Sequence, residues 1–201
     1  MNKVFSFAKI AGICLIAVLV LQVVLSLTKS NSPLLNIAIG FIVDSVWVAF
    51  FVLLIQSSAK RSPVIIPSWI ALGAFVAAFI STCFSGYASS LLTNSSEDWG
   101  TISTLFTVSN AFHYIYVICL AAGFFWLSKF FQKGSLTKIM CIVIAIVPIL
   151  LQIYNLTVHP WKIDDESTRN MLLTVVSVVW PAVIFIPQSI FLFAFSKLNK
   201  S

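Results

Sequence analysis

Charged side chains are scarce in this sequence. Only 9% of its 201 residues are Asp, Glu, Lys or Arg, whereas soluble domains carry about 25%. Hydrophobic residues make up 60% of the chain. Because so few charges do not cover a water-facing surface, a soluble domain is excluded. The lipid bilayer is the expected solvent and the first expected partner of this chain.

Several catalytic and cofactor motifs are also missing. The sequence has no H-E-x-x-H zinc motif and no glycine-lysine phosphate loop, and it has no G-x-S-x-G nucleophile motif. Its four cysteines form no C-x-x-C pair and all lie in apolar runs, where thiols behave as small hydrophobes. We therefore expect no metal and no cofactor, and the missing motifs argue against an enzyme.

Six apolar runs are long enough to span a bilayer. Each is close to the roughly 20 residues that cross the hydrocarbon core as a helix. Helices are expected because lipid offers no partners, so every backbone group must be satisfied within its own segment. The runs cover residues 10–27, 34–55, 64–86, 104–127, 139–156 and 171–195. The sequence predicts an all-α integral membrane protein, a bundle of six transmembrane helices that forms a single polytopic domain over residues 1–201.

The basic residues divide unequally between the two sides. With the N-terminus placed in the cytoplasm, nine lysines and arginines fall in cytoplasmic segments and three on the opposite side. Short cytoplasmic loops carry the excess of positive charge in membrane proteins, so both termini are predicted to be cytoplasmic. We interpret the net charge of +6 as anchoring beside anionic lipid, and we expect no nucleic-acid partner.

The first run and the short loops bear on localisation. The run 10–27 is longer than the 7–15 residues of a cleaved signal core, so it is expected to stay as an anchor. The short loops and sparse tails favour a multi-pass protein of a cell membrane, in particular a bacterial inner membrane.

One acid lies in the middle of the second run. Asp44 is the only ionisable residue between 34 and 55 and lies about ten residues from the outer end, or about 15 Å deep. An Asp at that depth costs about 2.5–3.5 kcal/mol on insertion scales. His113 has a matching depth in the run 104–127. If these two helices are neighbours, Asp44 and His113 form a proton-accepting pair or a clamp for a polar ligand.

Two further residues share these helix faces. Asn110 lies one turn before His113, and Trp47 lies one turn after Asp44, where an indole forms a wall of a ligand pocket. The opposing interpretation is structural, with Asp44 and His113 hydrogen-bonded to each other or to helix backbones. Such bonds average only about 0.6 kcal/mol in membranes, which is less than the insertion cost of the acid. The comparison favours a functional role for Asp44.

Prolines mark the sixth run. Pro181 and Pro187 are expected to bend the helix or to unwind it locally, because each removes a backbone hydrogen bond and frees a carbonyl four residues back. Broken helices expose backbone groups to ligands in transporters. Trp180 precedes Pro181 and is included in the candidate ligand site. A packing kink is the favoured interpretation of the prolines themselves, since proline is commoner in membrane helices than in soluble ones.

Three functions are compatible with these features. The first is a small-solute binding or transport protein with a polar site at mid-membrane and a small-molecule ligand. The alternative is a non-catalytic membrane subunit or assembly factor, with a membrane protein partner or a homo-oligomer, in which the polar residues specify packing. An intramembrane enzyme acting on a lipid or quinone, with Asp44 or His113 as acid or base, ranks last because no motif supports it.

Overall fold

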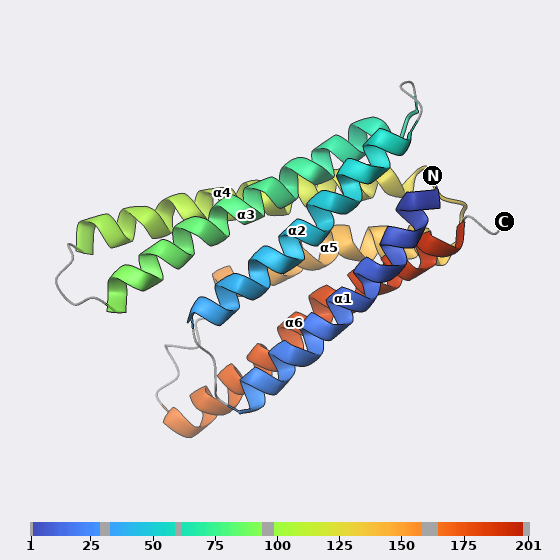
Figure 1. Ribbon diagram of the computed structural model, residues 1–201. Helices are drawn as coiled ribbons and strands as arrows, with labels where there is room; N and C mark the ends of the chain where they lie inside the picture. The colour runs from blue at the N-terminus through green and yellow to red at the C-terminus, as the bar shows by residue number, and fades with distance from the viewer. Residues whose placement is uncertain (1, 29–32, 59–61, 94–98, 158–164, 199–201) are drawn as a thin grey trace. The chain divides into compact units, whose positions relative to one another are not determined.

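The computed structural model describes residues 2–28, 33–58, 62–93, 99–157 and 165–198. All regular structure in these ranges is helical (Figure 1). The helices are α1 (Asn2–Leu27), α2 (Pro33–Ser57), α3 (Ile65–Thr93), α4 (Trp99–Ser128), α5 (Leu136–Thr157) and α6 (Glu166–Lys197). They group into two compact units, one of α2, α3 and α4 and one of α1, α5 and α6. The single domain over 1–201 stays a prediction.

The six predicted spans are confirmed as six helices, each long and apolar enough to cross a membrane. Isoleucine, valine and leucine dominate the exposed large side chains, as expected for a surface that faces hydrocarbon. Several helices extend beyond the apolar runs that predict them. The end of α3 continues to Thr93 through serines that bond their own helix, with Ser89 Oγ donating to the carbonyl of Ser85 at 2.8 Å. Apolar runs therefore mark only the hydrocarbon part of each helix.

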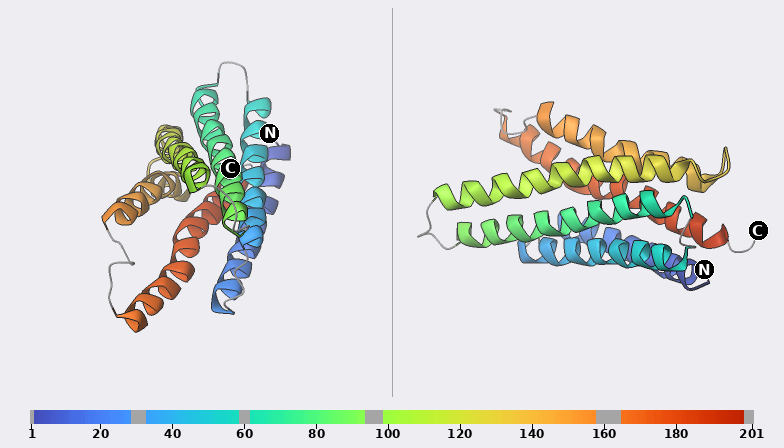
Figure 2. Two further views of the ribbon diagram at one scale, coloured as in Figure 1. Left: turned by 90° about the vertical axis from the view of Figure 1, so that its left-hand side faces the viewer. Right: turned by 90° about the horizontal axis from the view of Figure 1, so that it is seen from above.

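The first unit is an antiparallel set in which α3 lies between α2 and α4 (Figure 2). On the α2–α3 side, the rings of Phe41 and Phe79 lie 4.6 Å apart between centroids. On the α3–α4 side, the helices approach until only a glycine fits, because a Cβ on Gly123 would lie 2.9 Å from the backbone nitrogen of Ala71. Small residues at such crossings let membrane helices pack through dispersion contacts, since lipid provides no hydrophobic drive.

The second unit is built on α6, which packs against both α1 and α5. The start of α1 meets the end of α6, where the rings of Phe5 and Phe195 lie 5.4 Å apart. Phe131, just before α5, contacts the same Phe195 ring at 6.3 Å. This end of the unit therefore gathers most of its lysines. They are Lys3, Lys9, Lys129, Lys133, Lys138 and Lys197.

A bend or local unwinding was expected in the sixth helix, and the unwinding is not observed. α6 is helical from Glu166 to Lys197, through both Pro181 and Pro187. Each proline removes one hydrogen bond, and the two positions are separated by more than a turn, so the bonds between them remain. The helix is further held by its contacts with α1 and α5. The structure thus gives no unwound segment within α6 that would present a run of free backbone groups to a ligand.

Candidate functional site

Asp44 lies in the interior of the α2–α3–α4 unit, where only 7% of the residue is exposed. The ring pairs Phe41–Phe79 and Trp47–Phe75 lie on either side of it along α2 and α3. This antiparallel register places Asp44 opposite the small residues near Ala77, which is buried. The pairs Ser81–Ser109 and Phe75–Tyr116 continue the register to α4. Asp44 is therefore at nearly the same depth as His113.

The carboxyl group of Asp44 makes no hydrogen bond and no ion pair with any residue in the described ranges. The structure accordingly does not join it to His113 as a hydrogen-bonded pair. Its electrostatic neighbour is Tyr116 on α4, a residue that is partly buried. The Tyr116 ring in turn contacts the imidazole of His113, with centroids 5.7 Å apart and planes tilted by 44°. Asp44 and His113 are thus related through Tyr116, which interacts with both.

Trp47 lies one helical turn after Asp44 on α2 and forms part of the core there. It is fully buried, and its indole stacks on Phe75 of α3 with centroids 5.1 Å apart and planes only 5° from parallel. Phe124 of α4 meets it edge-on at 5.7 Å. These contacts fix the rotation of α2 about its own axis, so that Asp44 lies on the side of α2 that faces the interior of the unit. Trp47 closes one end of the site by packing, and its own ring is covered by other rings.

Asn110 lies elsewhere on α4. Its side chain is exposed, whereas the adjacent Ser109 is buried against α3. None of the hydrogen bonds in the described ranges involves the Asn110 amide. The structure therefore does not bring Asn110 together with Asp44.

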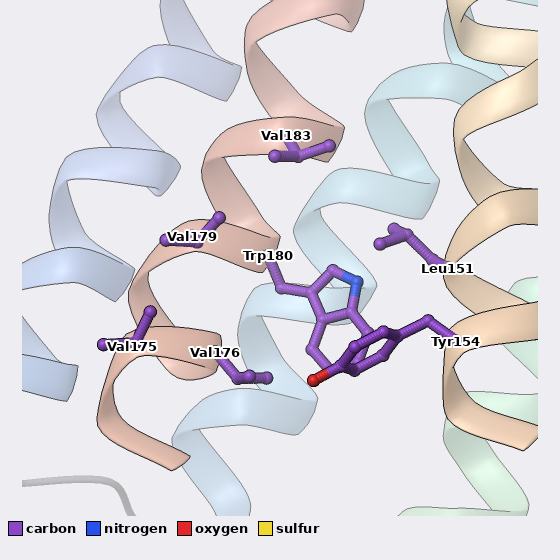
Figure 3. Close-up of a pocket in the computed structure, with 7 residues that line it drawn as sticks. All are labelled: Leu151, Tyr154, Val175, Val176, Val179, Trp180 and Val183. Atoms are coloured by element: carbon purple, nitrogen blue, oxygen red, sulfur yellow. The ribbon is translucent and has the colours of Figure 1, made fainter. Parts of the chain in front are cut away.

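Trp180 belongs to the second unit. It lines a pocket of about 220 Å³ between α5 and α6, and the Tyr154 ring meets its indole edge-on at 5.2 Å (Figure 3). The remaining lining residues are apolar: Leu151, Val175, Val176, Val179 and Val183. Such a wall fits a hydrocarbon group, for example a lipid acyl chain, and offers no charged or amide group to a polar solute.

Two polar features of the first unit were not singled out from the sequence. One is Tyr116, whose only signal was its position one turn after His113. The other is a buried pair in which Ser81 Oγ and Ser109 Oγ each donate to the carbonyl of the other residue at 2.9 Å. The two hydroxyls lie 3.0 Å apart. Interhelical bonds of this kind stabilise membrane bundles by about 0.6 kcal/mol each, so the serine pair is a structural link between α3 and α4.

The described residues contain no group of three His, Cys, Asp or Glu side chains placed to hold a metal ion. The chain matches no protein-family model, no curated protein and no solved structure. The residues of the site, and not a likeness to other proteins, therefore carry the evidence for function.

Proposed function

We propose that this chain is a small-solute binding or transport protein, with its polar site at mid-depth in the α2–α3–α4 unit. Asp44 is the central residue of this site, Tyr116 and His113 are its polar neighbours, and Trp47 closes one end. The observation that carries the proposal is that Asp44 is buried yet has no hydrogen-bond or ion-pair partner among the described residues.

The energetics favour a ligand over a structural role for Asp44. An Asp near the middle of a span costs about 2.5–3.5 kcal/mol on insertion. A structural acid offsets part of that cost through hydrogen bonds within the bundle, and Asp44 makes none within the described ranges. Intramembrane acids are rare and mark solute or proton pathways by default. A bound solute supplies the missing partner.

The chemistry of the unit indicates which solutes fit. Asp44 is the only Asp, Glu, Lys or Arg in α2, α3 and α4. A carboxyl group without a fixed cation beside it favours ligands that donate hydrogen bonds or carry positive charge. The aromatic faces of Tyr116 and His113 also favour cations over anions. We therefore propose a protonated amine or a similar hydrogen-bond donor as the solute class.

The test is the substitution Asp44→Asn, which keeps the size of the side chain and removes its charge. Native mass spectrometry of gently solubilised protein is expected to show a bound small molecule on the wild type and none on D44N. The matched control is Asp165→Asn, because Asp165 is an exposed acid at the start of α6. We expect D165N to retain the molecule.

Two outcomes would contradict the proposal. A small molecule retained equally by D44N and the wild type would show that Asp44 does not hold it. A wild type that carries a stoichiometric partner protein and no small molecule would instead support the alternative, a non-catalytic subunit or assembly factor.

We further propose that the protein lies in a bacterial inner membrane with both termini in the cytoplasm. The lysines gathered where α1 begins and α6 ends support this orientation for their unit. A fluorescent protein fused after Ser201 is expected to fluoresce, and alkaline phosphatase fused at the same point to be inactive. An active phosphatase fusion together with a non-fluorescent fusion would contradict the proposed cytoplasmic C-terminus.

A further inference from the structure

One side of the first half of α4 is polar and exposed. Ser103, Thr107, Asn110 and Tyr114 follow one another at intervals of four, three and four residues, and all four are exposed. This spacing places them in a single stripe along the helix, and Gly100 continues it at the interval of three. A face turned to hydrocarbon is expected to be apolar, as are the exposed positions Ile115 and Ile118 on the same helix.

Two hydroxyl groups on or beside this stripe are already satisfied by α4 itself. Thr107 Oγ1 donates to the carbonyl of Ser103 at 2.9 Å, and Thr104 Oγ1 donates to that of Gly100 at 2.8 Å. Asn110 differs, because its amide has two N–H donors and a carbonyl and makes no hydrogen bond within the described ranges. An amide without a partner in hydrocarbon costs several kcal/mol.

The depth of Asn110 places it away from water. It follows Trp99, the first residue of α4, by 11 positions, which is about 16 Å along the helix. It is also next to Ser109, which is buried in the interhelical serine pair. A helix of 30 residues is about 45 Å long and exceeds a hydrocarbon core of about 30 Å by about 7 Å at each end. Asn110 is thus within the hydrocarbon, where its amide needs a hydrogen-bond partner.

We propose that this α4 stripe is the contact through which two copies of the chain associate in the membrane. An amide is its own complement, since its N–H donors and carbonyl acceptor pair with a second amide. Across a two-fold axis between parallel helices, each residue of a stripe faces its own copy. Two Asn110 side chains then satisfy each other, as polar residues at the seams of paired helices do.

Other features of α4 suit the same partner. The alternation of three and four residues is that of left-handed helix pairs, the commonest packing in membranes. Gly100 and Ser103 are small and allow close approach. α4 has no Asp, Glu, Lys or Arg, so two copies meet without repulsion between like charges. This inference does not rest on the Asp44 site, because Asn110 and Asp44 are not in contact.

Disulfide trapping in native membranes tests the proposal. The native cysteines Cys14, Cys83, Cys119 and Cys141 are first replaced by alanine. Asn110→Cys and Thr107→Cys are then oxidised separately and are expected to give disulfide-linked dimers. Ile115→Cys is the matched control, since Ile115 is 46% exposed at a similar depth of α4 but lies outside the stripe. Trapping that is absent at 107 and 110, or equally strong at 115, would overturn the proposal.

A second measurement uses the chain with its native cysteines. Asn110→Leu is expected to weaken the dimer seen by native mass spectrometry by about 5- to 30-fold, the factor for 1–2 kcal/mol per polar contact. Asn110→Gln keeps an amide and is expected to retain most of the association. An unchanged dimer in N110L would count against the proposal. So would rapid reaction of the Asn110→Cys thiol with a membrane-impermeant maleimide, which would indicate a water-filled path along α4.

Discussion

Trp47→Ala is expected to lower the free energy of unfolding of the detergent-solubilised protein by about 2–3 kcal/mol. In soluble cores a Trp→Ala change costs about 3–5 kcal/mol. The part due to transfer out of water is small here, because lipid is as apolar as the core. The cavity and the lost dispersion contacts remain, and they involve rings from three helices, including Phe75 and Phe124. Unfolding by titration with a denaturing detergent measures the change.

The control for this prediction is Trp69→Ala, which removes the same side chain from α3 at a position that is 57% exposed. We expect W69A to stay within about 0.5 kcal/mol of the wild type, the range of most surface changes. If W47A unfolds at the same detergent fraction as W69A, the aromatic core does not hold α2, α3 and α4 together. The rotation of α2 that aims Asp44 inward would then need another cause.

Gly123→Ala is expected to destabilise the α3–α4 contact by about 1–3 kcal/mol, the usual cost of overpacking. The added Cβ would lie 2.9 Å from the nitrogen and 3.1 Å from Cα of Ala71. Both are backbone atoms, so a side-chain rotation does not relieve the clash and the helices must separate. This cost exceeds the gain in helix propensity of alanine over glycine, which is up to about 1 kcal/mol. Heat survival followed by size-exclusion chromatography is a suitable measurement.

Gly73→Ala supplies a matched control with the opposite expected sign. A Cβ on Gly73 meets no atom within 4 Å, so only the gain in helix propensity remains. G73A is expected to match the wild type or to exceed it slightly. A G123A variant as stable as G73A would show that the α3–α4 crossing is looser than the backbone distances indicate.

The positions of the helices were predictable from the sequence, because the bilayer imposes a length and a composition on every span. The ends were not. The apolar run begins at residue 10, whereas α1 begins at Asn2, since polar side chains are tolerated in a helix outside the hydrocarbon. The prolines left two outcomes open. Pro181 and Pro187 were compatible with a bend or with local unwinding, and two separated missing bonds leave α6 helical throughout.

The candidate site was only partly predictable. Asp44 is the only acid in its apolar run, so the sequence alone indicated it as a candidate site residue. The rise per residue of an α-helix gave its depth. Which side chains surround it depends on the rotation of each helix about its axis. That rotation is set by contacts such as Trp47 on Phe75, which join helices far apart in sequence. Tyr116 consequently interacts electrostatically with Asp44, and Asn110 is exposed on α4.

The packing of α1 along α6 has a consequence for synthesis. Phe5 meets Phe195, so α1 leaves the ribosome long before the helix that packs against it, α6. At 5–20 residues per second, α1 waits on the order of ten seconds in the bilayer before α6 follows. α2, α3 and α4 are consecutive and assemble during that interval. Nascent chains that stop before α6 are therefore expected to contain a folded three-helix unit and an orphaned α1, the state that quality-control proteases would meet.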